Sequence, residues 1–216
     1  QPVHVICVVD EAGKGSVLGP LVVAAVAIPS ETSLDDLGVR DSKVISQKER
    51  ERLYALIKKH SRVTAIRLDA AEIDAVRTEM TMNVAVARAH AQVINTLAPT
   101  RAYVDACDVN CFRYAEMVRV HLTHPCEIVS EHHADAKFPV VSAASIIAKV
   151  TRDRAIATLA KKYGDVGSGY PSDPVTIRFL NDWIEEHKVP PPIARKSWKT
   201  VSNLLARKSQ KSLMDF

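Results

Sequence analysis

Two apolar, β-branched segments near the start of the chain constrain its fold more than any other feature. Val3 to Val9 and Leu21 to Ile28 have strand character, and a glycine-containing turn separates them. Arg62 to Leu68 alternates polar with apolar residues, which predicts a third strand. Because the three segments can form an antiparallel meander, we expect the fold to begin as a sheet.

Beyond these segments, helical and extended patterns alternate, which predicts a mixed α/β fold. Ser46 is expected to cap a helix that ends near His60, and Pro99 ends a longer helix that begins at Thr78. The remaining predicted elements are strands at 101–105 and 127–130 and helices at 111–121, 140–162, 174–187 and 198–208. Asp173 is expected to cap the helix at 174–187, with Pro174 at its first position. We therefore expect an α/β core over residues 1–163, a helical appendage over 164–209 and a tail over 210–216.

Composition narrows the class of protein. The chain has 216 residues, a formal net charge of +4 and a pI of about 8.9. It contains no apolar run of the roughly 20 residues that span a bilayer and no secretory signal, so we expect a cytoplasmic protein with reduced thiols. Between His187 and Met214 there are seven Lys or Arg residues and no Asp or Glu. That distribution suits a polyanionic partner, although a solvated basic tail would look the same.

Four acidic residues stand where charged side chains gather in α/β sheets. Asp10 and Glu11 follow the first apolar run, Asp105 ends the predicted strand at 101–105, and Asp135 precedes the helix at 140–162. Taken singly, each is more often an exposed charge or a cap. Together they offer oxygen ligands for a hard divalent cation, Mg²⁺ or Mn²⁺.

If the four side chains converge, two cations about 3.5–4 Å apart would relieve their repulsion and suit phosphodiester hydrolysis. Asp10 and Glu11 can share one pocket only if the strand has ended by Glu11, because consecutive strand residues point to opposite faces. The turn that follows, Gly13-Lys14-Gly15, allows main-chain N–H groups to approach a phosphate or a sugar closely.

Six ordered blocks extend these features over most of the core. They are DEAGKG with LGP (10–20), DSK (41–43), YVD (103–105), ADAK (134–137), SAASIIAKV with RD (142–153) and SGYPSDP (168–174). In these blocks the chain resembles type 2 ribonuclease H (ribonuclease HII), in its archaeal form. The resemblance implies a ribonuclease H-like mixed sheet flanked by helices, with a C-terminal helical appendage. It also implies an endonuclease that cuts RNA paired to DNA, including single ribonucleotides embedded in duplex DNA, and leaves 5′-phosphate and 3′-hydroxyl ends.

The resemblance also implies roles for individual residues. The metal-binding and catalytic acids would be Asp10, Glu11, Asp105 and Asp135. The substrate-binding residues would be Gly13, Lys14, Gly15, Lys43, Lys149 and Tyr170. The glycine segment would sense the ribose 2′-hydroxyl, Tyr170 would pack at the RNA–DNA junction, and the lysines would contact phosphates without reading sequence. Lys14 stands where the family usually has Arg, and lysine lacks the planar fork that grips a phosphate in a bidentate manner.

The last seven residues resemble the sliding-clamp-interacting box of archaeal members of the family. Gln210, Leu213 and Phe216 match the box, whereas its second aromatic residue is missing after Phe216. The resemblance implies a sliding clamp as partner, with Leu213 and Phe216 as plug residues. A frayed C-terminus is the alternative.

Two other functions are compatible with the same residues. The chain could be a non-catalytic module that binds a hybrid duplex and whose acids hold a structural ion. It could also be a resolvase-type nuclease on the same fold, which would cut branched DNA and ignore a single ribonucleotide.

Overall fold

The structure is a computed structural model that describes residues 5–30, 34, 38–39 and 45–214, with the side chains of 136 and 211–214 left aside. The chain forms two compact units, each assembled from separated parts of the sequence. The first comprises residues 1–12, 22–67 and 81–151, and the second comprises 13–21, 68–80 and 152–216. The contiguous division expected at residues 163 and 209 stays a prediction about how functions are divided along the chain.

A five-stranded mixed sheet forms the centre of the first unit. Its strands are β1 (Ile6–Ala12), β2 (Leu21–Ile28), β3 (Arg62–Leu68), β4 (Arg101–Asp105) and β5 (Glu127–Glu131), in the order β3-β2-β1-β4-β5. β1 pairs antiparallel with β2 and parallel with β4, and β4 pairs parallel with β5. The mixed α/β sheet expected from the sequence is therefore confirmed, with β1 at its centre.

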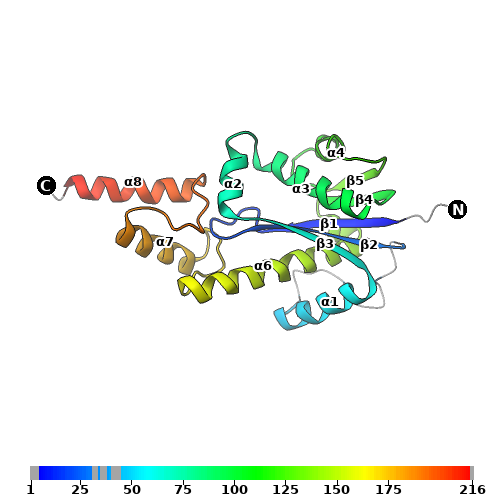
Figure 1. Ribbon diagram of the computed structural model, residues 1–216, viewed down its shortest axis with the longest axis horizontal. Helices are drawn as coiled ribbons and strands as arrows, with labels where there is room; N and C mark the ends of the chain where they lie inside the picture. The colour runs from blue at the N-terminus through cyan, green and yellow to red at the C-terminus, as the bar shows by residue number, and fades with distance from the viewer. Residues whose placement is uncertain (1–4, 31–33, 35–37, 40–44, 215–216) are drawn as a thin grey trace. The chain divides into compact units, whose positions relative to one another are not determined.

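Helices cover both faces of this sheet (Figure 1). α1 (Gln47–His60) and α6 (Ser142–Tyr163) lie on one face, and α3 (Met82–Leu97) and α4 (Cys111–Arg119) lie on the other. Because successive side chains of a strand point to opposite faces, alternate residues of each strand pack against the helices on one face. Val8 and Tyr103 of the sheet pack with Leu53, Ile57 and Ile146 from α1 and α6. Two short helices, α5 (Ala134–Lys137) and η2 (Pro139–Val141), lead from β5 into α6.

The helix expected to begin at Thr78 begins four residues later, and a separate helix precedes it. Thr81 is the N-cap of α3, where its hydroxyl accepts the Val84 N–H at 3.4 Å. The preceding helix, α2 (Ala70–Arg77), starts with a capping box formed by Asp69 and Glu72. The predicted start was wrong because Thr78 is the C-cap of α2, and Thr81 is the residue that caps α3.

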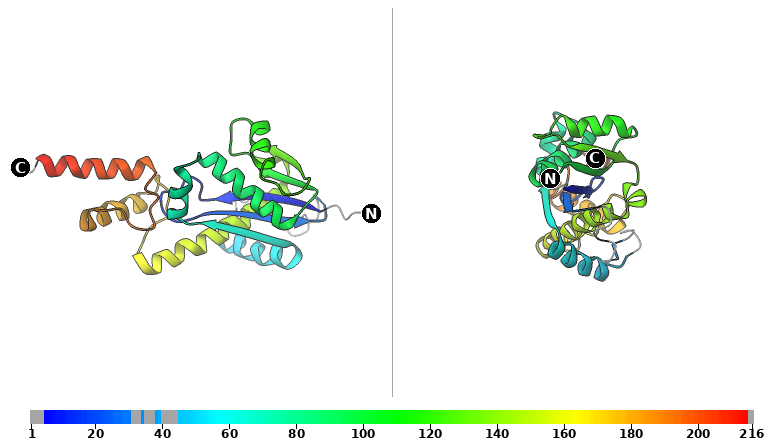
Figure 2. Two further views of the ribbon diagram at one scale, coloured as in Figure 1. Left: turned by 45° about the horizontal axis from the view of Figure 1, so that its top comes forward. Right: turned by 90° about the vertical axis from the view of Figure 1, so that its right-hand side faces the viewer.

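Two helices and the loops around them form the core of the second unit. α7 (Pro174–His187) and α8 (Lys199–Met214) lie side by side (Figure 2), with Leu180 and Ile184 packed against Val201 and Leu204. Asp173 caps α7, as expected, by accepting the Val175 N–H. α8 continues to Met214, beyond the end expected at Lys208. Of the helices in the described residues, none combines the length and the apolar character needed to cross a membrane.

Candidate active site

The strand that carries the first two acids does not end where the sequence suggested. β1 runs through Asp10 and Glu11 to Ala12, because the ladder with β2 continues to the pair Ala12–Val22. Asp10 and Glu11 therefore point to opposite faces of the sheet. Asp10 accepts a hydrogen bond from Ser145 of α6, whereas Glu11 meets His90 of α3 on the other face. The expectation that the strand has ended by Glu11 was wrong, but Glu11 raises the pKa values of both Asp10 and Asp105, so the three carboxylates are close enough to interact although the strand continues.

Asp10 is partly buried and lies near two other carboxylates. Burial raises the pKa of Asp10 well above its ordinary value, and the Glu11 and Asp105 carboxylates raise it further. Two hydrogen bonds act in the opposite direction: Oδ1 accepts the Glu11 N–H at 2.8 Å, and Ser145 donates its hydroxyl. Despite facing away from Glu11, Asp10 is thus coupled electrostatically to two other acids.

Asp105 interacts electrostatically with the fourth acid, Asp135. Burial raises the pKa of Asp105, and Glu11 and Asp135 add to that rise, while the Ala134 N–H, 3.5 Å from Oδ1, lowers it. Asp135 lies in α5 and is 9% exposed. All four acids expected from the sequence therefore interact across one end of β1 and β4.

The acids interact electrostatically, but their side chains, as far as the structure describes them, are not arranged as the ligands of a metal ion. Within the described ranges, no three His, Cys, Asp or Glu side chains are arranged to hold a metal ion as they lie. The acids instead accept hydrogen bonds from their neighbours. Their chemistry nevertheless fits a hard divalent cation, because carboxylate oxygens are its preferred ligands and a cation would offset the repulsion that raises the pKa values of Asp10 and Asp105.

Glu11 has partners that the sequence did not reveal. His90 Nε2 lies 2.8 Å from Glu11 Oε2, and Cys107 Sγ lies 2.8 Å from Oε1. Tyr114 of α4 contacts the other nitrogen of His90. His90 stands among apolar residues of α3, and no local sequence signal links it to Glu11.

The second unit holds the Gly-Lys-Gly segment. Gly13 has a φ of +85°, and a Cβ built on it would lie 2.4 Å from Arg152 Nε and 2.6 Å from the Pro20 carbonyl oxygen. Glycine is therefore required at this position. The Gly13 N–H donates to Tyr170 Oη at 3.1 Å, and the Arg152 guanidinium lies 4.9 Å from the centre of the Tyr170 ring. Two residues assigned to substrate by the resemblance, Gly13 and Tyr170, are thus in direct contact.

A buried arginine holds the carbonyl groups of this segment. Arg195 is 0% exposed, and its guanidinium donates to the carbonyls of Gly13 (2.6 Å), Lys14 (3.0 Å) and Gly19 (3.1 and 3.2 Å). Burial lowers the pKa of Arg195, and the positive charge of Arg152 lowers it further. Trp198 covers the guanidinium and donates its indole N–H to the Gly15 carbonyl at 3.4 Å. In the sequence, Arg195 is one of the seven basic residues between His187 and Met214, and no local pattern indicates that it is buried.

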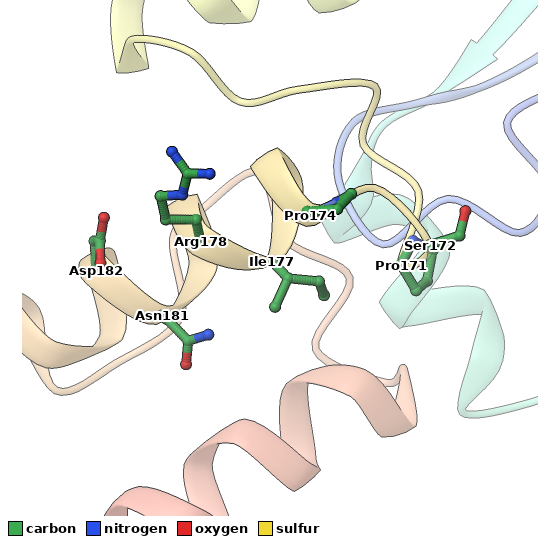
Figure 3. Close-up of a pocket in the computed structure, with 7 residues that line it drawn as sticks. All are labelled: Pro171, Ser172, Pro174, Ile177, Arg178, Asn181 and Asp182. Carbon is green, nitrogen blue, oxygen red and sulfur yellow. The ribbon is translucent and has the colours of Figure 1, made fainter.

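The loop before α7 is anchored to the same segment. The Gly169 carbonyl accepts the N–H groups of Val17 (2.8 Å) and Leu18 (3.0 Å), and Arg152 donates to the Ser168 carbonyl at 3.0 Å. A groove of about 640 Å³ continues along α7 from this loop (Figure 3). It is lined by Pro171, Ser172, Pro174, Ile177, Arg178, Asn181 and Asp182.

The other candidate residues occupy varied positions. Lys14 is partly buried and Gly15 is exposed. Lys149 is partly buried in α6, one turn beyond Ser145, which contacts Asp10. Gln210 is exposed on α8; Leu213 belongs to the same helix, but its side chain is not described. Lys43 and Phe216 lie outside the described residues.

Comparisons with known proteins agree with this arrangement. A family model described as Ribonuclease HII matches residues 8–201. Ribonuclease HII of Methanoregula boonei is 68% identical over 211 residues, which cover 98% of this chain and 99% of the relative. Ribonuclease H2 from Pyrococcus horikoshii OT3 has a similar structure, with a TM-score of 0.88 at 38% identity over 96% of this chain and 100% of that one. A structure of the PCNA:RNase HII complex from Archaeoglobus fulgidus matches with a TM-score of 0.84 at 43% identity, over 90% and 95% of the two chains.

The fold and these matches define the chain as a nuclease of the ribonuclease H class, a hydrolase that cuts RNA internally. Within that class it belongs to the ribonuclease HII family.

Proposed function

We propose that this enzyme cleaves the RNA strand of RNA/DNA hybrids and the 5′ side of single ribonucleotides embedded in duplex DNA, leaving 5′-phosphate and 3′-hydroxyl ends. Its role would be the removal of ribonucleotides during DNA replication and repair in the cytoplasm. Because the family consists of enzymes, catalysis rather than passive duplex binding is the function to test.

The observation that carries this proposal is the mutual coupling of Asp10, Glu11, Asp105 and Asp135. Burial and like charge raise the pKa values of Asp10 and Asp105, which is the electrostatic signature of a site that takes up positive charge. The four carboxylates would hold two divalent cations, Mg²⁺ or Mn²⁺. When bound, such ions lower the pKa of water and stabilise charge on a phosphoryl oxygen. Ser145 and the Glu11 and Ala134 N–H groups would keep the carboxylates oriented.

A substrate panel tests the proposal. The full chain is incubated with three duplexes: an RNA/DNA hybrid, DNA containing one ribonucleotide, and branched DNA without ribose. Each reaction is run with Mg²⁺, with Mn²⁺ and with a chelator. We expect cutting of the first two substrates only, and only with metal. Cleavage of branched DNA alone would instead support a resolvase, and binding without cleavage in any metal would support a binding module.

Recognition of ribose is proposed for the backbone of Gly13, Lys14 and Gly15, which follows the acids directly in the sequence. Only the 2′-hydroxyl distinguishes a ribose in a duplex from a deoxyribose, and it both donates and accepts hydrogen bonds. The contact between the Gly13 N–H and Tyr170 supports a shared role for the two residues. Lys43 and Lys149 would contact phosphates.

The backbone of Lys14 is proposed to recognise ribose, and its side chain to contact a phosphate. We expect Lys14→Ala to raise KM for a single-ribonucleotide duplex and to reduce the slope of log KM against log salt by about 1, because one phosphate contact is lost. Lys14→Arg should bind at least as tightly as the parent chain, since its guanidinium can grip a phosphate in a bidentate manner. Neither variant should change the preference for ribose over deoxyribose. A loss of that preference in Lys14→Ala would show that the side chain, not the backbone, reads the sugar.

A sliding clamp is the proposed protein partner. The Archaeoglobus fulgidus relative was solved as a PCNA complex, and Gln210 of the matching box is exposed here. We expect a chain that ends at Ser209 to lose binding to a sliding clamp in isothermal titration, while its cleavage of a short free duplex is unchanged. Leu213→Ala with Phe216→Ala should give the same result in the full-length chain. Undiminished clamp affinity in both variants would place the contact elsewhere.

A further inference from the structure

On the face of the sheet covered by α3, two buried polar side chains are linked to Glu11 by hydrogen bonds. His90 and Tyr114 are both 0% exposed. His90 Nε2 lies 2.8 Å from Glu11 Oε2, and His90 Nδ1 lies 3.0 Å from Tyr114 Oη. The two rings meet edge to face, with centroids 5.8 Å apart and an angle of 88° between their planes. Both nitrogens of the imidazole are therefore engaged in a place where water does not reach.

The chemistry of these groups sets the direction of the hydrogen bonds. An ionised carboxylate can only accept, so His90 Nε2 must donate to Glu11. In a neutral imidazole the other nitrogen then accepts, and Tyr114 supplies the proton. Burial raises the pKa of Tyr114 far above its ordinary value, so the phenol retains its hydrogen. His90 thus accepts a hydrogen bond from Tyr114 and donates one to Glu11, and the Tyr114 hydroxyl also interacts with Cys107.

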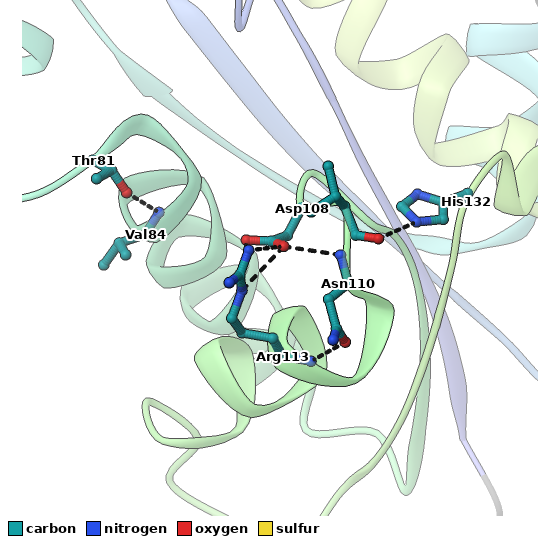
Figure 4. Close-up of polar contacts among 7 residues, drawn as sticks. Thr81, Val84, Asp108, Asn110, Arg113 and His132 are labelled. Carbon is teal, nitrogen blue, oxygen red and sulfur yellow. Dashed lines mark hydrogen bonds and ion pairs between the residues drawn. The ribbon is translucent and has the colours of Figure 1, made fainter.

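Cys107 engages the second oxygen of the same carboxylate, with Sγ 2.8 Å from Oε1. The loop that carries Cys107 is itself held in place (Figure 4). Asp108 accepts two hydrogen bonds of 3.1 Å from Arg113 Nε, Asn110 caps α4, and His132 Nε2 lies 3.2 Å from the Val109 carbonyl. Each carboxylate oxygen has two lone pairs. Cys107 and His90 thus each engage one oxygen of the Glu11 carboxylate.

We propose that His90, supported by Tyr114, is a positioning residue that fixes the Glu11 carboxylate for a divalent cation. This inference rests on the metal-binding role of Glu11 in the proposed function. Groups that orient a metal ligand typically change metal affinity or activity by about 10–100-fold when they are removed. A side chain held on both oxygens before the ion arrives loses little further rotamer freedom when it binds.

The test is direct binding of Mn²⁺ to the full-length chain, measured by the electron paramagnetic resonance signal of the free ion. His90→Leu removes the donor, and we expect it to raise the Kd for Mn²⁺ by about 10–100-fold. His90→Gln keeps an N–H donor and should recover part of that loss. Tyr114→Phe removes only a hydroxyl and should weaken binding by a smaller factor. The matched control is His124→Leu, because His124 contacts the Pro99 carbonyl at the opposite end of β4 from Asp105.

Kinetics give a second readout. At limiting Mn²⁺ the His90 and Tyr114 variants should lose kcat on a single-ribonucleotide duplex, and saturating Mn²⁺ should restore most of it, with KM for the duplex unchanged. A residue with only a structural role would lower the melting temperature without changing the Kd for Mn²⁺ in the folded protein. If His90→Leu does not fold, Tyr114→Phe decides the question, since its ring still fills the same space.

Two results would contradict the proposal, and they differ in scope. If Asp10→Asn weakens Mn²⁺ binding but the His90 and Tyr114 variants bind as the parent does, His90 does not position Glu11 and the proposed function stands. If the parent chain binds no Mn²⁺, or if Asp10→Asn binds it equally well, the metal site of the proposed function fails together with this inference.

Discussion

Replacing Asp10 or Asp105 by Asn is expected to reduce cleavage of a single-ribonucleotide duplex by at least about 10³-fold at saturating metal, because several kcal/mol of charge stabilisation depend on these ligands. Single-turnover assays in Mg²⁺ and in Mn²⁺ measure this effect. The change should fall on kcat, with duplex binding retained. Normal turnover by either variant would refute the proposed catalytic site.

The same substitution should make the metal-free protein more stable. Burial and neighbouring acids raise the pKa of Asp10 in the folded state. The stability that protonation of Asp10 provides is fully present below its unfolded pKa of about 3.9. It is lost as the pH rises through the raised folded value. In chelator at neutral pH, Asp10→Asn should therefore melt at a higher temperature than the parent, and the difference should vanish in acid. An equal or lower melting temperature at neutral pH would show that Asp10 is not destabilised by its surroundings.

The two glycines of the Gly-Lys-Gly segment should respond very differently to alanine. Gly13→Ala is expected to lower the free energy of unfolding by about 2–4 kcal/mol, since a left-handed backbone and a crowded Cβ both oppose the new methyl group. The methyl group would meet the Arg152 side chain and lie 2.6 Å from the Pro20 carbonyl oxygen, and Arg152 is itself held by hydrogen bonds to Ser16 and to the Ser168 carbonyl. The rate of cleavage should also decrease, because the hydrogen bond from the Gly13 N–H to Tyr170 Oη would be lost.

Gly15→Ala is the matched control. A Cβ on Gly15 has no atom within 4 Å, so stability should change by less than about 1 kcal/mol. Any loss of activity in this variant would then report a close approach of the substrate backbone rather than a folding defect. Chemical denaturation and KM measurements on both variants separate these effects. Equal destabilisation of the two variants would contradict the structural account of the turn.

Some parts of this architecture were accessible from the sequence. The apolar runs predicted the central strands, and Asp173 with Pro174 predicted the start of α7, because strand alternation and helix caps are local signals. The acids stood out for the same reason, since each lies at a predicted strand end or helix start. Motif blocks then supplied the family, which no single residue could have done.

Other parts were not accessible. The end of β1 was misplaced because its extent depends on β2, and a ladder between strands is not a property of either one alone. Nothing in the residues next to His90 or Arg195 indicates what their side chains contact. Their partners, Glu11 and the carbonyls of Gly13 and Gly19, lie 79 to 182 positions away in the chain. A buried polar group is interpretable only once its partner is known.

The remote origin of Arg195 also has a consequence for how the protein is made. Residues 13–21 join the same compact unit as residues 152–216, so the loop that would read ribose cannot acquire its final backbone support until Arg195 has left the ribosome. Until then, the nascent chain carries the four acids without the buried guanidinium that holds the Gly13 and Lys14 carbonyls.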